Sequence, residues 1–302
     1  MKILLLGKNG QVGWELQRSL AVLGEVVALD RHGEDGLCGD LSDLAGLART
    51  VQSVQPQVIV NAAAYTAVDK AESESELART LNALAPGVLA QEAARLNAWL
   101  IHYSTDYVFD GSGSTPWKES DPTGPLSVYG RTKLEGEQAL ADSGCRHLIF
   151  RTSWVYGVRG GNFAKTMLRL AAEREQLNVI DDQIGAPTGA DLLADVTAQA
   201  IRHVLPPMRR NDLAPSGIYH VAAAGETSWH GYARFVLAQA QAAGRALKAG
   251  PEQVQAIPSA AYPTPAKRPH NSRLDTSRLR NTFGLSLPCW QDGVKRMLAE
   301  TL

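Results

Sequence analysis

Met1-Lys-Ile-Leu-Leu-Leu-Gly7-Lys-Asn-Gly10-Gln-Val-Gly13 opens the chain, and Trp14–Leu23 follows with a helical pattern. The apolar run predicts a buried strand, and the glycines predict a turn into the helix. The order strand, glycine turn, helix is typical of a dinucleotide site, because N–H groups at a helix start can hold a pyrophosphate. The spacing is GxxGxxG rather than GxGxxG, so a plain strand–helix connection stays open as the alternative.

Each glycine of this turn has an expected task. Gly7 permits the tight turn, and Gly10 lets backbone N–H groups approach a pyrophosphate. Gly13 lets the helix pack closely against the strand. A dinucleotide-binding turn therefore explains why glycine stands at each of these three positions.

An acidic residue ends the next expected strand, Val26–Asp30. A carboxylate about 20 residues after the glycines is placed to accept hydrogen bonds from the adenosine ribose. Asp30 repels a 2′-phosphate and favours NAD, whereas Arg31 can pair with that phosphate and favours NADP. Both cofactors stay open.

Strands and helices alternate through the first half of the chain, which predicts an α/β fold with a doubly wound, mostly parallel, Rossmann-type sheet. Small residues, Ala62, Ala63 and Ala64, follow one strand and allow close approach of a cofactor. We expect a helix over Ser42–Val54 capped by Ser42 and a helical stretch over Ala67–Leu96 broken near Pro86. The expected strands are Met1–Leu6, Val26–Asp30, Leu37–Leu41, Gln57–Asn61, Trp99–Tyr103 and His147–Phe150.

Tyr129 and Lys133 stand four residues apart in a helical pattern, so they share one face of the helix. A free phenol has a pKa near ~10, and a neighbouring positive charge favours the phenolate. The pair can therefore exchange a proton with a substrate oxygen. An amphipathic helix with a lysine reaching to solvent is the alternative.

The chain divides into two interleaved parts on this pattern. We expect a dinucleotide-binding domain over residues 1–155, with 185–205 packing back onto it, and a smaller α/β substrate-binding domain over 156–302. A surface loop is expected at 206–215, where prolines and charges gather. Residues 258–273 read as an irregular loop whose basic groups, Lys267, Arg268 and Arg273, would suit a sugar-nucleotide diphosphate.

Composition excludes several classes of protein. The 302 residues are ordinary globular material, and the net charge of -1 gives no basic surface for nucleic acid or membrane. The N-terminal apolar run is too brief for a signal peptide, and no segment approaches the ~20 residues of a membrane span. Cys38, Cys145 and Cys289 are scattered and odd in number, which favours a reducing cytoplasm.

The chain resembles the extended short-chain dehydrogenase/reductase family nearly end to end. More closely it is similar to the members that reduce the C4 keto group of dTDP-4-dehydro-6-deoxy-L-mannose with NADPH or NADH to give dTDP-L-rhamnose. The motifs that carry the resemblance are Gly7–Gly13, Asn61-Ala-Ala-Ala-Tyr-Thr-Ala-Val-Asp-Lys-Ala-Glu72, His102-Tyr-Ser-Thr-Asp-Tyr-Val-Phe-Asp-Gly111, Tyr129-Gly-Arg-Thr-Lys133, Arg151-Thr-Ser-Trp-Val-Tyr156, Asp182-Gln-Ile-Gly-Ala-Pro-Thr188 and Ala261-Tyr-Pro-Thr-Pro-Ala-Lys-Arg-Pro-His-Asn-Ser272.

The resemblance implies a role for each motif residue. Tyr129 protonates the C4 oxygen, Lys133 lowers the pKa of Tyr129 and holds the nicotinamide ribose, and Thr105 hydrogen-bonds the same oxygen. Thr105, Asp106 and Trp154 contact the substrate. Cofactor contacts are implied for Gly7, Gly10, Gln11, Val12, Gly13, Asp30, Arg31, Asp40, Leu41, Ala62, Ala63, Ala64, Tyr65, Tyr129 and Lys133.

Some members of the family also hold Mg²⁺ at a dimer interface through acidic residues. The corresponding positions are Glu15, Asp191 and Glu300. Asp replaces Glu at 191, which shortens the reach by one methylene. A homodimer with Mg²⁺ is thus an expectation, and three solvated surface acids are the alternative.

Two other readings stay open. An epimerase or 4,6-dehydratase of the same superfamily would recycle its nicotinamide, but related dehydratases carry an acid pair where Asp106 is followed by Tyr107. A regulatory subunit that binds NAD(P) without turnover, like that of methionine adenosyltransferase, is the third. The Thr105, Tyr129 and Lys133 set favours the enzyme.

Overall fold

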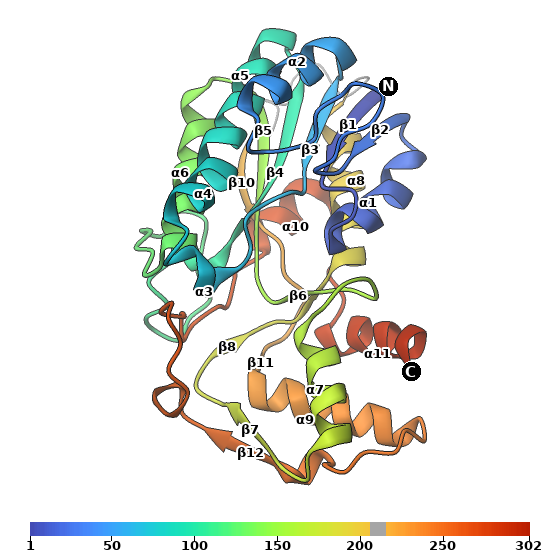
Figure 1. Ribbon diagram of the computed structural model, residues 1–302, viewed down its shortest axis with the longest axis vertical. Coiled ribbons are helices and arrows are strands. Elements are labelled where there is room, and N and C mark those ends of the chain that lie inside the picture. Colours follow the sequence, from blue (N-terminus) through green and yellow to red (C-terminus); the bar gives the residue numbers. More distant parts are fainter. Residues whose placement is uncertain (206–215) are drawn as a thin grey trace.

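Six parallel strands form the central sheet of the computed structural model, which describes residues 1–205 and 216–302 (Figure 1). The predicted surface loop at 206–215 lies outside the described residues. Every pairing between neighbouring strands of this sheet is parallel, as the sequence predicts. In spatial order the strands are β10 (Gly217–His220), β5 (Arg146–Thr152), β4 (Trp99–Thr105), β3 (Val58–Asn61), β1 (Lys2–Leu6) and β2 (Glu25–Leu29).

Helices cover both faces of this sheet, so its strands are apolar on both sides. Ile3 and Leu5 of β1 pack in one apolar cluster, and Leu4 and Leu6 pack in another on the opposite face. The first cluster includes side chains of α1 (Gln11–Ala21), α8 (Ala190–Val204) and α10 (Ser277–Phe283). The second includes side chains of α2 (Leu44–Val54), α5 (Ala85–Leu96) and α6 (Val128–Asp142). The predicted doubly wound α/β fold is confirmed.

The predicted strand Leu37–Leu41 does not form. Only an isolated bridge joins Glu34 and Leu37, and the chain then turns toward α2. The Cys38 backbone is instead satisfied by the Thr50 hydroxyl, which accepts from its N–H at 2.7 Å and donates to its carbonyl at 3.0 Å. A side chain that serves both backbone groups replaces the missing strand partner.

The cap of α2 also differs from the prediction. Asp43, not Ser42, is the N-cap, and its carboxylate accepts from the Gly46 N–H at 2.8 Å. Ser42 instead donates through its N–H and its hydroxyl to Asp40 at 2.9 and 2.7 Å. Ser42 therefore fixes the Asp40 carboxylate beside the sheet edge.

The helical stretch expected over Ala67–Leu96 is broken, but before Pro86 rather than at it. It contains α3 (Val68–Ala71), α4 (Ser75–Arg79), the π-helical segment η1 (Thr80–Leu84) and α5. Pro86 lies in the first turn of α5, where its missing N–H costs nothing. The stretch is therefore interrupted at residues 72–74, between α3 and α4, and widened at η1, a type of turn that is frequent at functional sites.

A third apolar cluster organises the lower part of the molecule in Figure 1. It gathers side chains of α7 (Phe163–Glu173), α9 (Trp229–Ala242) and α11 (Trp290–Thr301) around the parallel pair β7 (Leu177–Ile180) and β12 (Val254–Ile257). Shorter elements complete the described chain: η2 (Asp106–Val108), β6 (Val155–Tyr156), β8 (Ile184–Gly185), β9 (Thr188–Gly189), β11 (Thr227–Ser228), η3 (Pro251–Gln253) and η4 (Ser259–Ala261). In the described part of the chain, no helix combines the length and the apolar character needed to cross a bilayer.

Candidate active site

A cavity of about 790 Å³ lies at the carboxyl edge of the sheet. The strand order reverses between β1 and β3, and the residues after both strands, Gly7 and Ala62–Ala64, line this cavity. Open parallel sheets bind ligands at such a reversal, because the loops diverge there and leave a crevice. The volume suits a bound cofactor or substrate.

The glycine turn is tightly packed against its neighbours. Gly7 has a φ of +88°, and a Cβ there would lie 2.8 Å from the Ala63 nitrogen. A Cβ on Gly13 would lie 2.0 Å from the Gly7 carbonyl oxygen, so the helix approaches the strand as closely as the sequence predicts. Gly10 is the N-cap of α1 and has no side chain to occupy the space before the helix start. This end of α1 is therefore shaped to receive an anion.

The residues expected near the adenosine surround the outer end of the cavity. Asp30 accepts hydrogen bonds from the Asn9 amide at 2.6 Å and from the His32 N–H at 2.9 Å. The Arg31 side chain is 82% exposed and lies 3.6 Å from Asp40. A carboxylate and an exposed guanidinium thus stand side by side, so both cofactor types stay compatible with this end.

Tyr129 and Thr105 meet in the wall of the cavity. Burial raises the pKa of the Tyr129 phenol, and a hydrogen bond with the Thr105 hydroxyl partly offsets that rise. The edge of the Tyr107 ring packs against Tyr129, with ring centroids 5.5 Å apart. The phenol is therefore held protonated at neutral pH, which is the form that a proton donor needs.

Lys133 contacts the neighbouring strand β4 in this structure, and its expected effect on the pKa of Tyr129 stays a prediction. Its Nζ donates to the Tyr103 carbonyl oxygen at 2.6 Å and lies 3.1 Å from Nε2 of His102. Burial lowers the pKa of Lys133 to about 8. The lysine also lines the cavity, so one direction of its Nζ remains open to a ligand.

Four buried polar atoms on the cavity wall lack a hydrogen-bond partner: Gln11 Oε1, Asp106 Oδ2, Thr152 Oγ1 and Ser153 Oγ. Leaving such groups unpaired costs about 1–3 kcal/mol each, so a ligand that bonds them gains this energy. Burial also raises the pKa of Asp106 to about 6. These atoms mark the surface that a polar ligand would satisfy.

Trp154 lines the cavity on the side of the apolar cluster formed by α7, α9 and α11. Its φ of +51° is unusual for a bulky residue and holds the side chain away from the strand direction. The ring stacks on Trp229 with centroids 3.7 Å apart, and the Trp229 indole donates to Gln183 at 3.2 Å. The strained backbone is thus stabilised by the stack, and the ring forms a firm wall of the site.

The structure gathers most predicted site residues around one cavity. Gly13 and Tyr65 lie outside the lining: Gly13 packs behind the turn, and the Tyr65 hydroxyl donates to Glu74 at 2.6 Å. The predicted residues in the lining are Gly7, Gly10, Gln11, Val12, Asp30, Arg31, Asp40, Leu41, Ala62, Ala63, Ala64, Thr105, Asp106, Tyr129, Lys133 and Trp154.

Sequence reasoning missed other parts of the lining. Thr152 and Ser153 follow β5 at the same sheet edge, so the strand-end rule that selected Thr105 could have selected them. Asn9 lies between Gly7 and Gly10, so the glycine motif that selected its neighbours could also have selected it. Leu77 and Leu81 come from α4 and η1, and only the fold brings these helical residues to the cavity.

The two arginines of the 258–273 loop, Arg268 and Arg273, are engaged in ion pairs. Arg268 lies 2.7 Å from Asp69 at the start of α3. Burial raises the pKa of the Tyr107 phenol, and a hydrogen bond from the Arg268 guanidinium partly offsets that rise. Arg273 lies 2.6 Å from Glu226. The loop is therefore tied to α3, beside the cavity wall.

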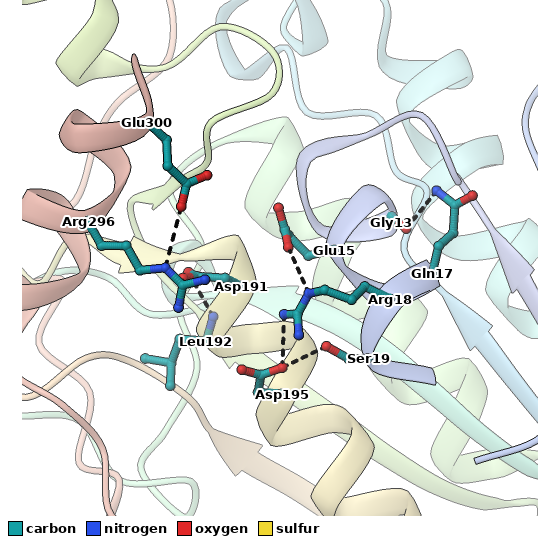
Figure 2. Close-up of polar contacts among 10 residues, drawn as sticks. All are labelled: Gly13, Glu15, Gln17, Arg18, Ser19, Asp191, Leu192, Asp195, Arg296 and Glu300. Atoms are coloured by element: carbon teal, nitrogen blue, oxygen red, sulfur yellow. Dashed lines mark hydrogen bonds and ion pairs between the residues drawn. The ribbon is translucent and has the colours of Figure 1, made fainter. Parts of the chain in front are cut away.

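Arginines bind each of the three acids expected to hold Mg²⁺ (Figure 2). Arg18 lies 3.6 Å from Glu15, and Arg296 lies 3.7 Å from Asp191 and 3.5 Å from Glu300. Across the described residues, no group of three His, Cys, Asp or Glu side chains is arranged to hold a metal ion. Within one chain these acids do not fit a cation, because guanidinium groups already neutralise them.

Comparison with known proteins gives consistent matches over the whole chain. The chain is 58% identical to the dTDP-4-dehydrorhamnose reductase of Escherichia coli K12 and also 58% identical to that of Shigella flexneri, in both cases over 99% of this chain and 98% of the relative.

Solved structures of the same kind match equally far. A dTDP-4-dehydrorhamnose reductase from Clostridium acetobutylicum has a TM-score of 0.88 at 34% identity, covering 99% of both chains. A dTDP-4-dehydrorhamnose reductase from Bacillus anthracis, solved with NADP, has a TM-score of 0.87 at 32% identity, again covering 99% of both. The family described as the RmlD substrate binding domain matches residues 1–302, and the chain belongs to it.

Proposed function

We propose that the protein reduces the C4 keto group of dTDP-4-dehydro-6-deoxy-L-mannose with NADPH or NADH and yields dTDP-L-rhamnose. Relatives at 58% identity carry the name dTDP-4-dehydrorhamnose reductase, and a similar structure holds NADP. The observation that carries the proposal is the Tyr129 phenol held against the Thr105 hydroxyl in the cavity that the glycine turn enters.

The residues of the cavity fit a nicotinamide cofactor. The N-terminus of α1 and Gly7 would hold the pyrophosphate, Asp30 and Arg31 the adenosine ribose or its phosphate, and Ala62–Ala64 the floor beneath it. Lys133 would hold the nicotinamide ribose. When bound, the cofactor would supply the hydride for the reduction.

Two side chains would carry the chemistry at the substrate oxygen, and two others would orient the sugar. Tyr129 donates its proton to the C4 oxygen as negative charge develops there. The Thr105 hydroxyl, which donates to Asp106 at 3.1 Å in this structure, would turn to donate to the same oxygen and stabilise it. Asp106 and Trp154 would orient the sugar, since Asp106 has an unpaired carboxylate oxygen and Trp154 presents a fixed ring.

The proposal extends to the organisation of the chain. Residues 1–155, with 185–205 packed back onto them, form the dinucleotide-binding domain. Most of the remaining chain between 156 and 302 forms the substrate-binding domain. The separate apolar clusters support this division, while β10 and α10 add residues 217–220 and 277–283 to the sheet side. The free state of all three cysteines is compatible with a cytoplasmic location.

A homodimer that binds Mg²⁺ is a separate proposal and needs a second copy of the chain. Glu15, Asp191 and Glu300 would have to exchange their arginine partners for the ion. Light scattering of the protein in Mg²⁺ and in EDTA tests it. If the measured mass of the protein is the same in Mg²⁺ and in EDTA, the proposal that Mg²⁺ holds the dimer together is wrong.

One assay tests the proposed reaction against its alternatives. The purified protein is mixed with the keto-sugar nucleotide and a limiting amount of NADPH or NADH, and both cofactor oxidation and sugar product are measured. A reductase oxidises one cofactor per sugar reduced. Product formed without net oxidation would indicate an epimerase or dehydratase, and cofactor binding without product would indicate a regulatory protein.

A further inference from the structure

A buried chain of hydrogen bonds runs behind the proposed site and ends at Lys133. Asn61 ends β3 and lies opposite His102 of β4 in the parallel register. The Asn61 amide nitrogen lies 3.2 Å from Nδ1 of His102, and Nε2 of the same ring lies 3.1 Å from Nζ of Lys133. The Asn61, His102 and Lys133 side chains are all at least 98% buried.

The direction of each hydrogen bond along this chain follows from its first member. The Ala63 backbone N–H donates to the Asn61 side-chain oxygen at 3.2 Å, so this oxygen faces Ala63 and the amide nitrogen faces His102. An amide nitrogen only donates, and Nδ1 of His102 must therefore accept. In a neutral imidazole the proton then sits on Nε2, which faces Lys133.

The tautomer of His102 has a consequence for Lys133. An ammonium has three donors and no acceptor, so it would place N–H against N–H at this contact. An amine accepts from Nε2–H, donates to the Tyr103 carbonyl oxygen at 2.6 Å and keeps one hydrogen for the cavity. The chain of bonds is satisfied throughout only when Lys133 is neutral.

We propose that Asn61 and His102 are positioning residues that set the protonation state of Lys133, because they fix the Nε2–H tautomer of the imidazole against the lysine. Neither residue lines the cavity itself, and both act through Lys133, which does. Asn61 also connects this hydrogen-bond chain to the cavity lining, since its side-chain oxygen accepts from the backbone N–H of Ala63. The consequence for catalysis rests on the proposed function, whereas the tautomer does not.

Other charged groups also stand near Lys133, and the charge of Glu137 raises the pKa of Lys133 against the larger effect of burial. Glu137, one turn further along α6, is bound on two sides by Arg151 of β5 at 2.9 and 2.6 Å and by the Ser104 hydroxyl at 2.5 Å. His147 on β5 faces His102 and has its pKa lowered by burial.

On the cavity side stand Tyr129 of the same helix and Asp106 of η2. Burial lowers the pKa of His102 well below its usual value, so the imidazole is neutral and its tautomer is the variable that remains.

Nitrogen NMR of the cofactor-free protein tests the tautomer directly. The spectrum of histidine ring nitrogens is recorded on the full chain, and the His102 signals are assigned from their loss in His102→Gln. We expect a protonated Nε2 and an unprotonated Nδ1. A protonated Nδ1 would overturn the proposal, and this test needs no variant to be active.

Two variants test the effect on Lys133, whose Nζ titration is followed by NMR. In His102→Gln an amide oxygen can turn to Nζ and accept from an ammonium. In Asn61→Asp a carboxylate accepts from both Ala63 and Nδ1–H, so the proton moves to Nδ1 and Nε2 becomes an acceptor. Both variants should raise the pKa of Lys133, by about one unit.

His230→Gln is the matched control, because His230 lies in the smaller part of the chain and contacts the Val254 carbonyl oxygen. It should leave the Lys133 titration unchanged. If His102→Gln and Asn61→Asp also leave it unchanged, His102 only fills space. If the wild-type enzyme proves to be a reductase, its loss of activity at alkaline pH should move upward in both variants, whereas a failed reductase assay leaves the NMR outcome intact.

Discussion

Lys133 of α6 donates a hydrogen bond of 2.6 Å to the backbone carbonyl oxygen of Tyr103 on β4. This bond ties the helix that carries Tyr129 to the strand that ends at Thr105. Because strand and helix are joined at this point, the two hydroxyl groups of the proposed site keep their relative positions. The lysine is thus part of the scaffold as well as a group on the cavity wall.

Replacing Lys133 with Met should damage both cofactor binding and turnover. The variant keeps the length of the side chain but leaves the Tyr103 carbonyl oxygen unpaired and removes the proposed contact with the ribose. We expect kcat/KM to fall by about 100-fold and the Kd for NADPH to rise, measured by initial rates and fluorescence titration. A variant that lost turnover but bound the cofactor normally would restrict Lys133 to a role in the chemistry.

Asp30 and Arg31 should divide cofactor preference between them. Arg31→Ala removes the exposed guanidinium that can pair with a 2′-phosphate, so the KM for NADPH should rise by about 10-fold while that for NADH changes little. Asp30→Ala should raise the KM for NADH more than that for NADPH. The measurement is the ratio of kcat/KM for the two cofactors, and equal effects of either variant on both would contradict the assignment.

Gly13 should tolerate no side chain, whereas Gly10 should tolerate one. A Cβ at 13 would lie 2.0 Å from the Gly7 carbonyl oxygen, but a Cβ at 10 meets that oxygen only at 3.4 Å, an ordinary contact. Gly13→Ala should therefore lower the free energy of unfolding by about 2 kcal/mol or more, and Gly10→Ala by less than ~1 kcal/mol. Urea unfolding of the two variants decides the matter, and equal losses would be inconsistent with the packing.

The burial of Asp106 should make stability fall as pH rises between about 4 and 6. Burial raises its pKa to about 6, so the folded protein binds a proton there that the unfolded chain, with a pKa near ~3.9, has already released. Ionisation then costs the folded state on the order of 2 kcal/mol. Asp106→Asn should remove this part of the pH dependence, seen as a smaller change in Tm between pH 4 and 6. An unchanged slope would show that Asp106 is ionised throughout.

Local patterns predicted the scaffold because each depends on neighbours in sequence. The apolar run of β1 and the glycines that follow it specify a strand and a turn by themselves, and Thr105 is found by its place at a strand end. The segment at 37–41 failed because Thr50, a residue of a later helix, satisfies the Cys38 backbone in place of a strand. The prediction that Ser42 caps α2 was wrong because the Ser42 N–H and hydroxyl donate to the Asp40 carboxylate instead.

Contacts between distant segments could not be predicted. The four-residue spacing of Tyr129 and Lys133 considers only one helix, so it could not predict the contacts of Lys133 with His102 and Tyr103 on a separate strand. The stack of Trp154 on Trp229 joins residues far apart in the chain. The pairing of Arg296 of α11 with Asp191 of α8 likewise joins distant segments, whereas Arg18–Glu15 and Arg296–Glu300 are pairs within one helix.

The most direct test of the account is single-turnover oxidation of NADPH by Tyr129→Phe with the keto-sugar nucleotide bound. The variant keeps the ring and its packing against Tyr107 but removes the proton that the proposal requires. We expect the rate to fall by about 100-fold or more relative to wild type, with the Kd for NADPH unchanged. A rate within about twofold of wild type would contradict the assignment of Tyr129 as the proton donor.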